Sequence, residues 1–138
     1  MKHEINLSWD EGMSFTTDLD GHKLTLDASP EVGGQDKGPR PKKLMLVSLA
    51  GCTGMDVVSI LKKMRVEYDS LNIKVEGEST EEHPKYYKSM KVIYEFKGND
   101  LPLDKLQKAV NLSSEKYCGV QALYKMAIPV ETEIRILK

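Results

Sequence analysis

The two cysteines are the residues of this chain best suited to chemistry. Cys52 lies in the segment LAGCTG (residues 49–54), and Cys118 lies in SEKYCG (residues 114–119). They are too far apart for a CxxC redox motif or a zinc-binding cysteine pair. Two interpretations stay open: a thiol pair that can form a disulfide, or two small core residues, since free cysteine is among the most buried residue types. Spacing by itself favours the core interpretation.

Two local features favour a redox role. Gly51 and Gly54 flank Cys52 inside a predicted helix, where each glycine costs about 1 kcal/mol relative to alanine. This cost indicates that a substrate or another backbone approaches the sulfur closely, although tight helix packing explains the glycines equally well. Both cysteines also lie on predicted helices, which can hold two sulfurs at a defined separation.

A reactive cysteine needs a nearby positive charge that stabilises its thiolate. The candidate cations are Arg40, Lys42 and Lys43, which all precede Cys52. The two lysines lie about three helical turns from the cysteine, so they are not its neighbours along the helix. Asp56 follows Cys52 by four residues and would oppose thiolate formation on the same helix face. We interpret Asp56 as a solvated or capping carboxylate.

Alternation and helical periodicity place these residues on a mixture of strands and helices. The predicted elements are three short strands within residues 1–27, an irregular segment at 28–41, a helix at 42–66, two pairing strands at 71–75 and 86–96, a helix at 103–117 that ends at Gly119, a short helical piece that follows through Tyr124, and a last strand at 128–136. Strands grouped at both ends of two helices predict an α+β fold and not a βαβ winding.

The composition of the chain argues against several kinds of partner and ligand. The 138 residues fit a single domain, 1–138, and 20 basic and 21 acidic residues give a net charge of −1, which does not favour nucleic acid as a partner. No run approaches the roughly 18 apolar residues of a membrane span, so we expect a cytoplasmic protein without a membrane partner. Three scattered histidines share no ligand spacing with the cysteines, so no metal site is predicted.

The first long helix favours self-association. Its first half, over residues 44–50, is apolar nearly all round and is therefore expected to be buried. At about 25 residues the helix would be roughly 37 Å long, which is more than a small monomer needs. A homodimer would cover the excess apolar surface.

The segment GPRPKKLMLVSLAGCTGMDVV (residues 38–58) resembles the first cysteine helix of the OsmC/Ohr family, and SSEKYC (residues 113–118) resembles its second cysteine motif. The resemblance covers nearly the whole chain and looks closest to a branch other than the well-studied peroxidases. It implies an OsmC-like fold with antiparallel sheets packed on two main helices. It also implies an intertwined homodimer with active sites at the interface.

The same resemblance implies a mechanism. Cys52 would attack an organic hydroperoxide and become a sulfenic acid, and Cys118 would convert it to a disulfide. No bound cofactor is implied; an external dithiol, either lipoyl or a small thiol, would be the electron donor. The alternatives are a non-enzymatic redox sensor and a module that binds a small apolar ligand.

This chain departs from the pattern of the OsmC/Ohr family at the residues that would activate the Cys52 sulfur. The family usually has a glutamate nine or ten residues before the first cysteine, where this chain has Lys43 and Lys42. The expected arginine of the early strands is also missing. Arg40, held by Glu31, or Lys43 is the candidate replacement.

Overall fold

The computed structural model describes residues 1–138 as two compact units, Met1–Met45 and Leu46–Lys138. The division falls at the start of the helix that carries Cys52, so the carboxy-terminal unit contains both cysteines.

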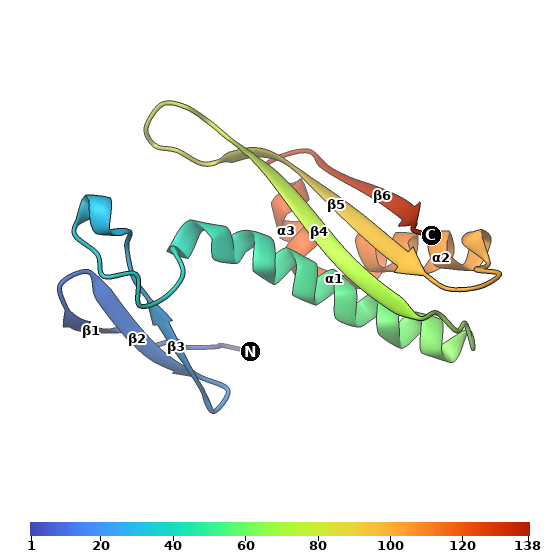
Figure 1. The fold of residues 1–138 in the computed structure, drawn as a ribbon, viewed down its shortest axis with the longest axis horizontal. Helices are drawn as coiled ribbons and strands as arrows, with labels where there is room; N and C mark the ends of the chain where they lie inside the picture. Colours follow the sequence, from blue (N-terminus) through green and yellow to red (C-terminus); the bar gives the residue numbers. More distant parts are fainter. The chain divides into compact units, whose positions relative to one another are not determined.

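The amino-terminal unit is built on an antiparallel meander of three strands. These are β1 (Ser8–Glu11), β2 (Ser14–Leu19) and β3 (His22–Leu26), in the order β1-β2-β3 (Figure 1). Gly12 and Gly21 have φ values of 56° and 81° in the connecting turns, a region open to glycine because it has no Cβ. The predicted meander is confirmed, but the first strand begins at Ser8, and Ile5 precedes it as an exposed residue.

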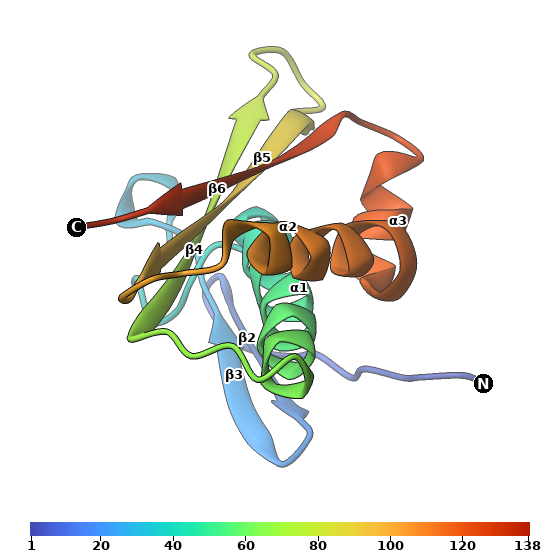
Figure 2. The ribbon, with the colours of Figure 1, turned by 90° about the vertical axis from the view of Figure 1, so that its right-hand side faces the viewer.

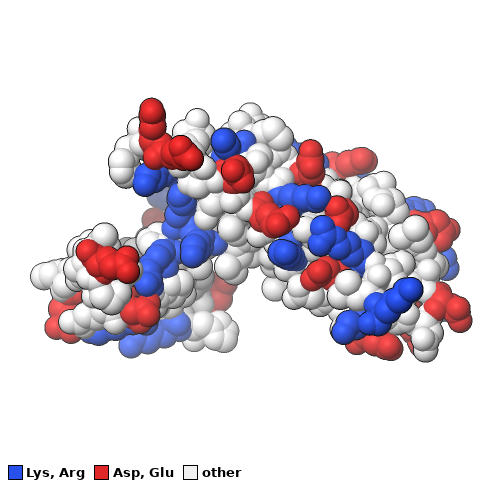
Figure 3. All heavy atoms as spheres, turned by 45° about the horizontal axis from the view of Figure 1, so that its top comes forward, with Lys and Arg blue, Asp and Glu red and all other residues white.

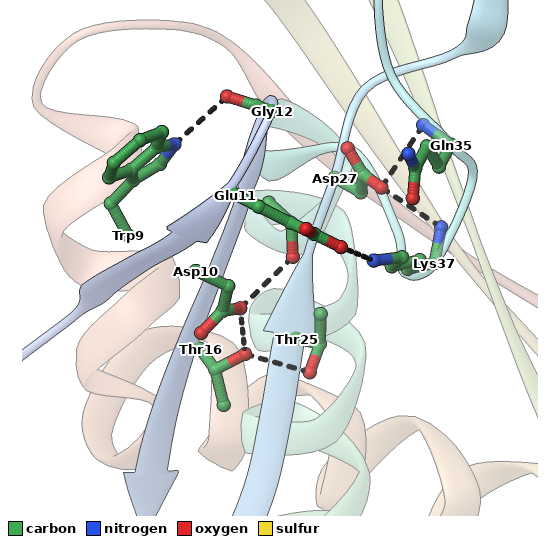
Figure 4. A network of polar contacts seen from close by, with 10 residues as sticks. Trp9, Asp10, Glu11, Gly12, Thr16, Thr25, Asp27, Gln35 and Lys37 are labelled. Carbon is green, nitrogen blue, oxygen red and sulfur yellow. Dashed lines mark hydrogen bonds and ion pairs between the residues drawn. The ribbon is translucent and has the colours of Figure 1, made fainter.

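Asp27 organises the irregular segment that follows β3 (Figure 4). Its carboxylate accepts hydrogen bonds from the backbone N–H groups of Ala28 at 2.7 Å and of Gln35 and Lys37 at 3.2 Å. Asp27 is only 3% exposed. Burial raises the pKa of its carboxyl group, but the three N–H donors outweigh burial and leave that pKa below the ordinary value.

Two short 3₁₀ turns complete this unit. They are η1 (Pro30–Val32) and η2 (Pro41–Lys43), each with a proline in its first turn. The prediction of an irregular segment between the meander and the long helix is thus confirmed.

The carboxy-terminal unit contains a second sheet, in the order β4 (Ser70–Ser79), β5 (Tyr87–Lys97) and β6 (Val130–Ile136). The predicted hairpin between β4 and β5 is confirmed. The expectation of purely antiparallel sheets is wrong, because β6 pairs in parallel with β5, from Met90 opposite Val130 to Phe96 opposite Ile136. Parallel neighbours need a long crossover, and the chain between the two strands forms one from helices (Figure 1).

The helices differ from prediction at their ends. They are α1 (Leu44–Lys63), α2 (Leu103–Leu112), the π-helical turn η3 (Ser113–Tyr117) and α3 (Gly119–Lys125). Helix α1 ends earlier than expected, and Arg65 follows it with a left-handed φ of 58°. Gly119 does not end the second helix: it begins α3, and Cys118 is the N-cap of that helix. Figure 2 shows α2 crossing α1.

The core of this unit lies where α1 and α2 pack against the sheet. It includes Leu49, Val57 and Leu61 of α1, Val92, Tyr94 and Phe96 of β5, and Leu106 and Val110 of α2, all 0% exposed. Alternate residues of β5 face the helices, as the period of a strand requires.

The other face of α1 is apolar but exposed. Met45 and Val47 are 42% and 62% exposed, so the expected burial of the first half of this helix is wrong for the single chain. The segment Pro41–Lys63 is long and apolar enough to cross a membrane. A stripe of four buried residues, Leu49, Thr53, Val57 and Leu61, nevertheless marks α1 as a helix of the core.

Charges of both signs are interspersed on the face drawn in Figure 3. On the sheet, the Lys91 Nζ atom lies 2.9 Å from Glu133 Oε1, and Arg135 pairs with the same carboxylate. Such mixing agrees with the net charge of −1.

Candidate active site

The structure brings the two cysteines together. Cys52 comes from α1 and Cys118 from the junction between η3 and α3. Their Sγ atoms and a carboxylate oxygen of Asp56 all lie within 4.8 Å of one another. Cys52 and Asp56 share a helix face because they are four residues apart.

The π-helical turn η3 positions Cys118. The backbone N–H of Cys118 donates to the carbonyl oxygen of Ser113 at 2.8 Å, five residues back, which is the π-helical pattern. The chain then turns into α3, and the N–H of Gln121 donates to Cys118 Sγ at 3.4 Å. The sulfur is therefore held by the end of one helical segment and the start of the next.

A chain of buried hydroxyl groups ends on Asp56. Ser113 Oγ donates to Asp56 Oδ2 at 2.9 Å, Thr53 Oγ1 lies 2.8 Å from Ser113 Oγ, and Tyr94 OH lies 2.7 Å from Thr53 Oγ1. Ser113 has a single hydroxyl proton, which it gives to the carboxylate, so it accepts from Thr53, and Thr53 accepts from Tyr94. These hydrogen bonds link β5, α1 and η3, and they hold the Asp56 carboxylate in place.

The two sulfurs have different environments. Cys52 is half-buried, whereas Cys118 is 2% exposed. Burial raises the pKa of Cys118 to about 11, and Cys52 and the Asp56 carboxylate add to this increase, while the Gln121 N–H opposes it. Burial likewise raises the pKa of Tyr94 to about 12. Cys118 is thus a protonated thiol near neutral pH, and Cys52 is the sulfur that solvent reaches more easily.

The interpretation of Asp56 as a solvated or capping carboxylate is wrong. Asp56 is half-buried and bonded to Ser113 beside both thiols. None of the ion pairs in the chain includes it. It lines a cavity of about 420 Å³ with Lys63 and Lys108 among the other lining residues.

The remaining candidate residues lie in the amino-terminal unit. Arg40 donates to the Asp36 carboxylate and to the carbonyl oxygen of Gly38, so its partner is Asp36 and not Glu31. Glu31 is exposed in η1, and Lys43 is exposed in η2. A role for any of them in activating Cys52 stays a proposal.

The two glycines beside Cys52 have different surroundings. A Cβ at Gly54 would lie 2.8 Å from Ile73 Cδ1, so tight packing against β4 explains this glycine. A Cβ at Gly51 would meet nothing within 4 Å. Close packing of the single chain therefore accounts for Gly54 alone.

Sequence reasoning missed the hydroxyl groups of the site. Thr53, Tyr94 and Ser113 are each 0% exposed. A signal was present for two of them, since Thr53 interrupts an apolar helix face, and Ser113 falls on the apolar face of the second predicted helix. Polar groups at such positions need buried partners.

A sequence model of the OsmC-like protein family matches residues 34–133. The chain belongs to the OsmC-like protein family. Protein YhfA of Escherichia coli K12 is 31% identical over 128 residues, which are 92% of this chain and 92% of that protein. A crystal structure of a hypothetical protein from Aquifex aeolicus is 32% identical with a TM-score of 0.85, covering 99% of this chain and 98% of that one.

More distant OsmC-like structures share the fold. An OsmC-like protein from Mycoplasma pneumoniae is 19% identical with a TM-score of 0.80, covering 100% of this chain and 99% of that chain. An organic hydroperoxide resistance protein from Legionella pneumophila is 15% identical with a TM-score of 0.69, covering 96% and 97%. The α+β architecture of this chain is therefore that of the OsmC-like proteins.

Proposed function

We propose that this OsmC-like protein reduces organic hydroperoxides by a thiol-dependent reaction in the cytoplasm. The observation that carries the proposal is the approach of Cys52 Sγ and Cys118 Sγ to within 4.8 Å. A disulfide bond is about 2.05 Å long, so a closure of less than 3 Å joins the sulfurs. A peroxide-related redox role is also what membership of the family suggests.

The difference in exposure supports distinct roles for the two cysteines in this proposal. Cys52, which is half-buried, attacks the terminal peroxide oxygen as a thiolate, the O–O bond breaks, and the alkoxide takes a proton from solvent and leaves as the alcohol. The resulting Cys52 sulfenic acid then reacts with the Cys118 thiol, which forms the disulfide and releases water. An external dithiol, lipoyl or small, reduces the disulfide by exchange and is itself oxidised.

The exposed apolar face of α1 supports a homodimer as the working form. A cavity of about 750 Å³ on this unit is lined by Met55, Val58, Leu71 and Ile73, among others. Exposed contiguous apolar surface of this kind marks association sites. Arg40 and Lys43 remain the candidate cations for activating Cys52 in this dimer.

A steady-state peroxide assay tests the proposal. Cumene hydroperoxide is mixed with the reduced protein and either dithiothreitol or dihydrolipoamide, and the remaining peroxide is measured with time. Catalytic consumption is expected, and Cys52→Ser should abolish it. Mixed with peroxide in the absence of a dithiol, Cys118→Ser should consume one equivalent and leave a sulfenic acid that dimedone traps. The absence of turnover with both donors would refute peroxidase activity.

The position of Asp56 favours a second candidate, a non-enzymatic redox sensor. A carboxylate beside both thiols opposes thiolate formation, and slow oxidation suits a sensor better than an enzyme. In the same assay a sensor consumes one equivalent of peroxide per protein, forms the Cys52–Cys118 disulfide and does not turn over.

A further inference from the structure

We propose that the reduced site binds a thiophilic divalent cation, of which Zn²⁺ is the best match, through Cys52, Asp56 and Cys118. The cysteine and histidine spacing of the sequence predicted no such site. The fold creates it, because α1 supplies two of the donors and the η3–α3 junction supplies the third. The proposal does not rest on peroxide reduction.

The distances fit a tetrahedral ion. Zn–S bonds of about 2.3 Å place two sulfurs about 3.8 Å apart around a tetrahedral centre, and a carboxylate oxygen at about 2.0 Å lies slightly closer to each sulfur. The three donor atoms are all within 4.8 Å of one another. Changes of about 1.3 Å or less in the distances between the donor atoms therefore produce the coordination geometry.

The chemical types of the three ligand atoms determine which metal ion is preferred. Two thiolates favour a soft or borderline cation over Mg²⁺ and Ca²⁺, which prefer oxygen ligands. A bound cation coordinates cysteine as the thiolate, so each cysteine ligand releases its proton when the metal binds. It would also give Asp56 the positive partner that no ion pair provides in this chain.

Two of the three proposed ligands accept hydrogen bonds from neighbouring groups of the protein. Hydrogen bonds that orient a ligand are typical of protein metal sites. Ser113 Oγ donates to Asp56 Oδ2, and the N–H of Gln121 donates to Cys118 Sγ. A carboxylate has two oxygens, so Asp56 can keep the serine bond while it offers the other oxygen to the ion.

The fourth coordination position would come from outside the three residues. Asp56 lines the cavity of about 420 Å³ described above, which gives water a route to the ion. Two thiolates and a carboxylate leave one net negative charge around Zn²⁺, and Lys63 and Lys108 on the same cavity offset it. Three protein ligands and an open position are characteristic of catalytic rather than structural zinc sites.

Cobalt substitution tests the site. The full chain is reduced with a phosphine, freed of metal by a chelator, and titrated with Co²⁺ without oxygen. One equivalent should produce a thiolate-to-cobalt charge-transfer band in the near ultraviolet, with visible bands of a tetrahedral ion. Zn²⁺ should then displace Co²⁺, which yields the affinity for zinc.

Matched variants separate this site from adventitious binding. Asp56→Asn should weaken Zn²⁺ binding tenfold or more, and Ser113→Ala should weaken it about 10–100-fold through loss of the supporting bond. Asp104→Asn, at an exposed residue of α2, should leave it unchanged. Far-ultraviolet circular dichroism shows that each variant is folded. A missing charge-transfer band, or equal affinity in the wild type and Asp56→Asn, would overturn the proposal whatever the peroxide assay shows.

Discussion

Replacing Thr53 with valine tests whether the buried hydroxyl chain stabilises the fold. Thr53 is 0% exposed and lies 2.7 Å from Tyr94 OH and 2.8 Å from Ser113 Oγ. Valine has nearly the same shape, so Thr53→Val removes the hydroxyl without creating a cavity. The change isolates the hydrogen bonds from the packing.

The expected cost follows from what each neighbour loses. Tyr94 OH keeps no other hydrogen-bond partner in this structure, and a buried unpaired donor costs about 1–3 kcal/mol. Ser113 keeps its bond to Asp56, so its loss is about 0.5–1.5 kcal/mol. The extra buried methyl group returns about 0.8 kcal/mol. Thr53→Val should therefore lower the free energy of unfolding by about 1–4 kcal/mol, or the melting temperature by about 3–12 °C.

Urea unfolding followed by circular dichroism measures this difference. The protein concentration is kept constant, because self-association would shift the midpoint. The double variant Thr53→Val/Tyr94→Phe lacks the unpaired hydroxyl, so it should be about 1 kcal/mol more stable than Thr53→Val. Thr132→Val, on β6, is the control and should stay within about 0.5 kcal/mol of the wild type. A Thr53→Val protein as stable as the control would refute the reasoning.

Three further predictions concern other parts of the chain. Iodoacetamide at neutral pH should alkylate Cys52 at least ten times faster than Cys118, because Cys118 is 2% exposed and burial raises its pKa to about 11; mass spectrometry of the modified peptides that shows equal rates would contradict this. Burial opposes ionisation of Asp27, but its three backbone N–H donors lower its pKa below the ordinary 3.8. The carboxylate therefore stabilises the amino-terminal unit fully above pH 3.8 and progressively less as the pH falls through the lower pKa of the folded protein. The fluorescence of the single tryptophan should report this acid transition, and Asp27→Asn should remove the pH dependence, so an unchanged transition argues against it. Gly77→Ala should destabilise the chain by about 1–3 kcal/mol, because the new Cβ would lie 2.7 Å from the Tyr87 ring; urea midpoints equal to those of the wild type would show that the ring moves freely.

The sequence was informative wherever a local pattern determines structure. Alternation located the meander and the β4–β5 hairpin, because the side chains of a strand face opposite sides with a period of two. Helical periodicity located α1 and most of α2. The cysteine pair also came from the sequence, although the surrounding motifs and not the spacing made it credible.

The missed features depend on contacts between distant segments. The direction of β6 is set by the path of the crossover, and residues 128–136 alternate in the same way in a parallel or an antiparallel strand. The role of Asp56 depends on Ser113, which lies 57 residues later and reaches it from η3. From the helix sequence alone, a carboxylate beside an apolar helix face is expected to be solvated. Its hydrogen-bond partner is known only once the distant segment that lies across the site has been placed.

The expected burial of the first half of α1 is not seen in the single chain, and the reason is related. Apolar residues on all sides predict cover, yet Val47 is 62% exposed in the single chain. Composition shows that a surface is apolar, but it does not show which molecule covers it. The homodimer proposed above would resolve the difference, and the oligomeric state in solution would test it.

The π-helical turn restricts how the gene can change in length. Successive residues of an α-helix are about 100° apart around the axis, and the wide turn at Ser113–Tyr117 holds one residue more than a regular turn. Deleting one of its codons would regularise the helix and rotate Cys118 away from Cys52 while leaving the hydrophobic pattern of α2 unchanged. In descendants of this gene that keep the thiol pair, insertions and deletions should therefore be found in the loop between β4 and β5 rather than between Ser113 and Cys118.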